Sequence, residues 1–207
     1  MERANEVLEF WFGRGPWDAA RLAERSRFWF GAGDSAEAVA ARDALIRSQL
    51  EPMLERAARG EFASWAASPK RRLALIILFD QVPRNAYRGT AAAFAFDREA
   101  LALSLEGMQL AADAALDPVE RLFFYLPLEH AESMEAQDTA VAALERLRSE
   151  APTELKGASE GWLGFAHKHR DIIEKFGRFP YRNKVLGRES TAAELEWLAA
   201  QSDRFGQ

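Results

Sequence analysis

The sequence predicts an all-α protein, and both its composition and its pattern of apolar residues support this fold class. The 207 residues include only 6 Val, 5 Ile and 4 Thr, too few β-branched side chains for an ordinary sheet. The chain also contains 39 Ala and is rich in Leu, Glu and Arg, which are strong helix formers. Apolar residues recur at helical spacing, and capping residues separate the periodic stretches. These features argue against a β-sandwich, a barrel or a large parallel sheet.

The N-terminal part of the chain predicts three helices. Glu2–Phe12 has an apolar face, and the Gly- and Pro-containing sequence after it ends this helix. Asp18 is the expected N-cap of a second helix, which ends near the Phe-Trp-Phe sequence. Ser35 begins a longer helix that reaches Gly60 and is expected to kink at Pro52.

A central helix is predicted over Pro69–Gln81. Ser68 is its N-cap, and Pro69 occupies the first helical position, where an N–H group has no partner within the helix. This segment is apolar on nearly every side, so we expect it to be buried among the other helices.

The rest of the chain predicts further helices that start at capping residues. Asp97, Asp117 and Ser133 are the expected N-caps of three of them, and the third helix ends near Ser149. The last two are predicted over Ser159–Phe176, closed by Gly177, and from the capping box Thr191–Glu194 to Gln201. No Pro-, Gly- or Ser-rich linker divides the chain. We therefore predict one domain, residues 1–207, of eight to nine stacked antiparallel helices.

Charge and residue content exclude several classes of function. Without cysteine the chain forms no disulfide, zinc finger or iron–sulfur cluster. The net charge of −5 argues against nucleic-acid binding, and the longest apolar run, Leu73–Phe79, is too short to cross a membrane. The acidic N-terminal segment lacks the apolar stretch of a signal peptide. We expect a cytoplasmic protein that binds neither nucleic acid nor membranes.

Three ionisable residues interrupt the apolar faces of predicted helices: Asp80, His130 and His169. Each stands where helical spacing directs the side chain inward. A buried carboxylate without partners is costly, so Asp80 must find a cation or several hydrogen-bond donors. These three residues are the candidate catalytic residues.

Polar residues near the ends of these helices allow two interpretations. In the first, ion pairs tie the turns to the core, and each histidine bonds to a backbone carbonyl. In the second, Arg84, Arg178 and Arg182 clamp an anion in a cleft. The candidate ligand-binding residues of that cleft are Gln81, Arg84, Asn85, Glu132, Arg178, Arg182 and Asn183.

The segment 166–190 is basic although the chain as a whole is acidic. It holds 7 Lys and Arg against 3 acidic residues, a net charge of +4. Phe179, Pro180 and Tyr181 lie among these cations, which suits a carboxylate, a phosphate or an acidic peptide. Alternatively, the arginines pair with acidic residues of the chain itself, and the sequence leaves both interpretations open.

The sequence contains no motif for a metal or a cofactor, and we expect neither. It has no Gly-rich phosphate loop, dinucleotide fingerprint, Gly-x-Ser-x-Gly elbow or His-Glu-x-x-His pair. His130 and Glu132 are two residues apart, so on a helix their side chains would point in different directions and could not bind the same metal ion. Asp80 with His130 or His169 could still transfer protons in a hydrolase.

Several blocks of sequence resemble a bacterial family catalogued as domain of unknown function 924. These blocks are Leu8–Gly13, Leu73–Asn85, Phe124–Glu132, Phe176–Asn183 and Leu186–Thr191. The resemblance implies an all-helical fold similar to tetratricopeptide repeats, but no established activity or catalytic residue. Glu129, Ala131 and Tyr181 depart from the family pattern, in which an apolar residue, a small hydroxyl residue and a histidine are frequent.

Three hypotheses of function follow. The first is a binding module for an anionic small molecule or an acidic peptide. The second is a hydrolase-type enzyme that uses Asp80 with His130 or His169. The third is an interaction scaffold without a small-molecule site, in which exposed aromatic residues such as Trp11 and Trp29 contact a protein partner or form a homodimer.

Overall fold

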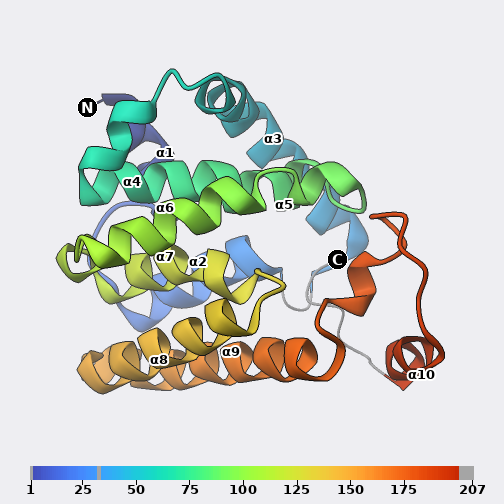
Figure 1. Ribbon diagram of the computed structural model, residues 1–207. Coiled ribbons are helices and arrows are strands. Elements are labelled where there is room, and N and C mark those ends of the chain that lie inside the picture. The colour runs from blue at the N-terminus through green and yellow to red at the C-terminus, as the bar shows by residue number, and fades with distance from the viewer. Residues whose placement is uncertain (1, 32–33, 201–207) are drawn as a thin grey trace.

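The computed structural model describes residues 2–31 and 34–200, which fold into helices joined by short turns (Figure 1). The first α-helices are α1 (Glu2–Phe12), α2 (Ala19–Phe30), α3 (Ala36–Ala58), α4 (Pro69–Ile76) and α5 (Val82–Ala86). The later ones are α6 (Asp97–Gln109), α7 (Pro118–Glu129), α8 (Met134–Glu150), α9 (Lys156–Phe176) and α10 (Ala192–Ala200). None of the described residues lies in a strand, which confirms the predicted all-α fold class. The likeness to tetratricopeptide repeats remains a prediction.

Most predicted capping residues do cap helices. Side chains accept hydrogen bonds from backbone N–H groups of the first helical turn at Asp18, Ser35, Ser133 and Thr191. Asp117 and Glu120 form a reciprocal capping box at the start of α7. The start of α9 differs from the prediction, since this helix begins at Lys156. Gln201, the predicted end of the last helix, lies outside the described residues.

The core fills the space around a long central helix. In Figure 1, α4 and α5 run through the middle of the molecule as one continuous rod, and α8 and α9 lie side by side below it. One large cluster of buried apolar residues extends from Ala4 to Ala166. Trp11 and Trp29 belong to it, with 0% and 5% of their surface exposed, so the prediction that they form an exposed interface is wrong. Among the described residues, no helix is both long and apolar enough to span a bilayer.

A π-helical turn, η2 (Ile77–Gln81), joins α4 to α5 and extends the predicted central helix beyond Gln81. Pro83 explains it, because proline has no N–H group and its ring clashes with the carbonyl four residues earlier. The N–H of Val82 therefore donates to the oxygen of Ile77, five residues back. Arg84 Nη1 donates to the Asp80 carbonyl at 2.8 Å, and Asn85 Nδ2 to that of Gln81 at 2.8 Å. The turn thus brings polar side chains into the centre of the molecule.

We predict that Gly107→Ala destabilises the protein. A Cβ atom at this position in α6 would lie 2.4 Å from the Phe124 ring and 2.7 Å from Arg72 Cδ, and both side chains are buried. We expect a loss of about 1–3 kcal/mol in the free energy of unfolding, measured by urea denaturation. Gly161→Ala in α9 is the control. No atom lies within 4 Å of its added Cβ, so that variant should gain about 0.5–1 kcal/mol from helix propensity. Equal effects of the two substitutions would contradict the prediction.

Candidate functional site

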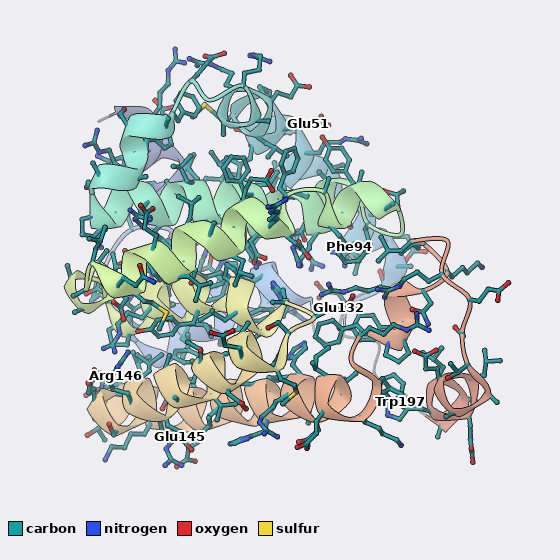
Figure 2. The ribbon with its side chains drawn as sticks, in the orientation of Figure 1. Glu51, Phe94, Glu132, Glu145, Arg146 and Trp197 are labelled. Atoms are coloured by element: carbon teal, nitrogen blue, oxygen red, sulfur yellow. The ribbon has the colours of Figure 1, made fainter. Side chains whose placement is uncertain are left out.

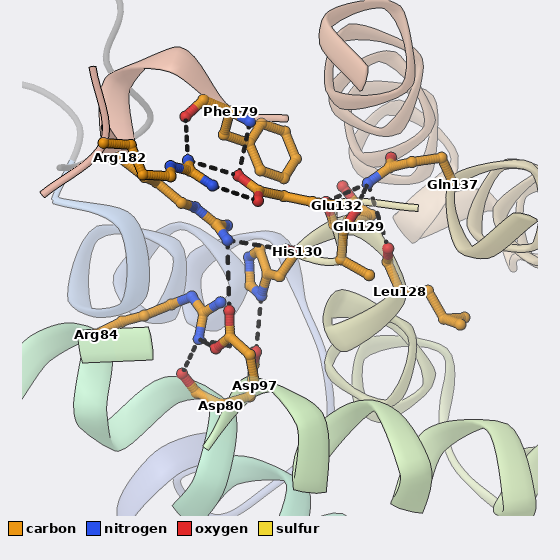
Figure 3. Close-up of polar contacts among 12 residues, drawn as sticks. Asp80, Arg84, Asp97, Leu128, Glu129, His130, Glu132, Gln137, Phe179 and Arg182 are labelled. Carbon is orange, nitrogen blue, oxygen red and sulfur yellow. Dashed lines mark hydrogen bonds and ion pairs between the residues drawn. The ribbon is translucent and has the colours of Figure 1, made fainter. Parts of the chain in front are cut away.

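Asp80 lies on the π-helical turn, is fully buried, and has its carboxylate surrounded by donors (Figure 3). Its oxygens lie 2.8 Å from His130 Nδ1, 3.1 Å from Arg84 Nη1 and 2.6 Å from Gln81 Nε2. Burial alone would raise the pKa of Asp80, but the Arg84 cation and His130 outweigh it and lower the pKa to about 2. Asp80 is therefore ionised at neutral pH.

His130 is the C-cap of α7, and its side chain remains 15% exposed. Because the Asp80 carboxylate only accepts hydrogen bonds, Nδ1 carries the proton and Nε2 of the neutral ring has a lone pair. Burial and the Arg84 cation lower the pKa of His130 to about 4, although Asp80 opposes this. At neutral pH this pair consists of a carboxylate and a neutral imidazole.

Two arginines and a second aspartate join Asp80 and His130. We call this group the Asp80 cluster: Asp80, Arg84, Asp97, His130 and Arg182. Arg84 Nη1 bridges Asp80 and Asp97, and its distance to Asp97 is 2.8 Å. Arg182 reaches the same Asp97 at 3.4 Å and donates to the His130 carbonyl at 3.1 Å. Both guanidinium groups are more than nine-tenths buried, yet Arg84 Nη2 and Arg182 Nε have no hydrogen-bond partner among the described residues.

Asp97 belongs to the cluster, although the sequence predicts no site role for it. It was expected to cap α6, but the N-cap is Phe96, and Asp97 is the first residue of the helix. An aspartate at a helix start gives the same sequence signal in both cases. Only the fold shows that two arginines from elsewhere converge on it.

His169 is buried as predicted, but it pairs with a different acid. Its Nδ1 lies 3.0 Å from the carbonyl oxygen of Phe165 and 3.3 Å from Glu129 Oε2. Its ring is 6.3 Å from that of His130, centre to centre, and perpendicular to it. Asp80 is thus paired with His130, one of the two predicted alternatives. Glu129 had been noted only as a departure from the family pattern.

The remaining candidate ligand residues join other contacts. Glu132 accepts a hydrogen bond from the Phe179 N–H group (Figure 3). It also pairs with Arg188. Arg178 and Asn183 both contact Glu194 and so hold α10. Asn85 accepts a hydrogen bond from Arg88. These contacts agree with the interpretation in which ion pairs tie the turns to the core.

The arginines of the basic segment 166–190 are paired within the chain. Arg170 contacts Asp138 at 2.6 Å, Arg178 contacts Glu194 at 2.6 Å, and Arg188 contacts Glu132 at 2.6 Å. The segment's charge is thus largely neutralised by the protein's own acids.

Neither the hollows described on the surface nor any metal-binding group of acidic and histidine side chains coincides with the candidate site. Two hollows, of about 540 and 730 Å³, lie at the α1–α2 turn and between α6 and α8, and none of the candidate site residues lines them. In residues 2–31 and 34–200 no three His, Asp or Glu side chains are grouped to hold a metal ion. Asp80, Arg84 and Arg182 are buried, whereas the side chains of His130 and Asp97 remain 15% and 24% exposed.

Comparison with known proteins identifies relatives but no activity. The sequence model of a family described as bacterial protein of unknown function (DUF924) matches residues 7–202. A solved structure of a protein of unknown function from Agrobacterium tumefaciens is 36% identical, with a TM-score of 0.70. The alignment covers 88% of this chain and 99% of that one. No curated protein matches the chain.

We predict that His130 makes stability depend on pH. Its pKa is about 4 in the folded protein, below the roughly 6.5 of an unfolded histidine, so the unfolded state takes up this proton first as the pH falls. The free energy of unfolding should therefore drop between about pH 6.5 and pH 4, by up to about 3 kcal/mol, in urea denaturation. His130→Gln should remove the part of this drop that lies above about pH 5, since carboxylates with a lowered pKa, such as Glu194, add a drop of their own below it. His167→Gln, at an exposed position of α9, should keep the full drop, and a drop above about pH 5 that persists in His130→Gln would refute the assignment.

Proposed function

The chain belongs to the bacterial family of unknown function DUF924, and we propose that it binds a small anion, a carboxylate or a phosphate, at the Asp80 cluster. One observation carries the proposal: Arg84 Nη2 and Arg182 Nε are buried N–H donors for which residues 2–31 and 34–200 provide no acceptor. An unpaired buried donor costs about 1–3 kcal/mol, so an oxyanion that accepts both gains that energy. Because both arginines contact Asp97, the free donors belong to adjacent side chains.

The charges of the cluster favour a small ligand whose binding is coupled to a proton. Asp80 and Asp97 already balance Arg84 and Arg182, so the cluster is neutral when His130 is neutral. Protonation of His130 adds one positive charge and turns Nε2 into a third donor. Because the arginine donors are buried, a single anionic group fits better than an acidic peptide. The partly exposed His130 is the point of entry.

The absence of cysteine fits a reducing compartment, and we place this binding in the cytoplasm.

We predict that phosphate, sulfate or citrate raises the melting temperature more than chloride at matched ionic strength. The gain should be larger near pH 5 than near pH 7.5, because anion binding favours protonated His130. A ligand at 100 times its Kd stabilises by about 2.7 kcal/mol, which thermal unfolding detects. Arg182→Gln should lose the anion-specific gain.

Arg121→Gln is the matched control. Arg121 is 8% exposed and ion-paired, like Arg182. It lies near the start of α7, however, and pairs with Glu150 at the end of α8. Any loss of stability common to buried arginines then appears in both variants, and only the response to anions separates them. If all anions act alike, or if both variants lose the response, the proposal fails.

A second candidate function, hydrolase-type catalysis, is supported by the Asp80–His130 pair. The Nδ1–H group of His130 donates to Asp80 at 2.8 Å, so Nε2 carries the lone pair, on a ring that is partly exposed. A histidine oriented in this way by a carboxylate can act as a general base. Nε2 would take a proton from a water that attacks an ester, phosphoester or amide. Arg84 Nη2 and Arg182 Nε, which have no acceptor in the part of the chain that the structure describes, would stabilise the negative oxygen that forms.

We predict that any hydrolysis found with a panel of such substrates falls by about 10²–10⁴-fold in His130→Gln, the usual contribution of a general base. Asp80→Asn should act in the same direction, because it removes the negative charge that keeps the proton on Nδ1 and adds an amide donor that favours the other tautomer. His169→Gln should retain most activity, since His169 pairs with Glu129 and not with Asp80. Full activity in His130→Gln would rule out this assignment.

A further inference from the structure

A groove of about 730 Å³ lies between α6 and α8, away from the Asp80 cluster. Its lining residues come almost entirely from one face of α8 and are Met108, Glu135, Asp138, Thr139, Ala142, Ala143 and Arg146. The middle of this face is occupied by alanines, which allow another helix to approach closely. Leu105 in α6 and Leu110, the C-cap of this helix, are 37% and 66% exposed. The groove therefore offers one face of a helix with alanines at its middle and charged residues on both sides of them.

The charges along this face are arranged symmetrically. Asp138 and Arg146 are equally distant in sequence from Ala142, on opposite sides of it. Their side chains are 57% and 52% exposed, and Figure 2 shows Arg146 and Glu145 at the surface of α8. Asp138 contacts Arg170 at 2.6 Å and Arg146 contacts Asp113 at 3.6 Å. Both charged groups thus remain accessible from outside.

From this symmetry we propose that the groove binds a second copy of this chain, with the two α8 helices antiparallel about a two-fold axis at Ala142. In such a pair every contact occurs twice, because residue i meets j and j meets i. Asp138 then lies opposite the second copy's Arg146, and Arg146 opposite its Asp138. Glu145 lies opposite Thr139, and Glu135 opposite Ser149, so no like charges face each other. An unrelated helix would have no reason to match this symmetry.

Sedimentation equilibrium tests the proposal. The wild-type chain should form dimers, and Asp138→Arg or Arg146→Asp alone should weaken association at least about tenfold, because each places like charges opposite one another. An equal mixture of these two variants should recover dimers, since every pair across the axis is then opposite in charge. Ala142→Arg, at an exposed position, should prevent association by steric overlap.

Arg148→Asp is the matched control. It reverses an exposed charge on the same helix, outside the groove, and should leave association unchanged. Circular dichroism confirms that the variants are folded. A wild type that remains monomeric to millimolar concentration overturns the proposal. So do a dimer that none of the groove variants affects and a mixture of the two charge variants that stays dissociated.

Discussion

The buried carboxylate of Asp80 constrains much of this structure. A carboxylate with none of its surface exposed must be surrounded by hydrogen-bond donors or cations. In this structure they come from separate parts of the chain. Arg84 and Gln81 are supplied by the central helix, and His130 by the end of α7. Through Arg84 the network continues to Asp97 at the start of α6, and from there to Arg182. One acidic side chain thus fixes the relative positions of helix ends that are distant in sequence.

Helical periodicity was enough to predict that Asp80, His130 and His169 face inward, and capping residues located most helix starts. Periodicity tells which side of a helix is buried, but it does not tell which helix lies opposite. The partner of His169 therefore could not be predicted, and Glu129 emerges only when α7 and α9 are placed together.

Residues with two roles were also misread or read only in part. Glu194 was predicted as the capping-box residue of the last helix, and it does accept the Thr191 N–H at 2.7 Å. The same carboxylate also accepts hydrogen bonds from Arg178 and Asn183, which the sequence assigned to a ligand site. In the sequence, the capping motif already accounts for the glutamate at this position, so the pattern does not suggest that it has further partners. The structure therefore shows, as the sequence could not, that acidic residues of the chain itself pair with arginines such as Arg178.

The ion pair between Asp97 and Arg182 has a kinetic consequence. These residues are 85 positions apart, so the contact closes a long loop, whereas Asp80 and Arg84 meet within one helix. Closing a long loop costs chain entropy before the contact contributes any stability. We expect this ion pair to form late in folding and therefore to act mainly by slowing unfolding. The C-terminal segment that supplies Arg182 thus helps to set the lifetime of the native state, in addition to its equilibrium stability.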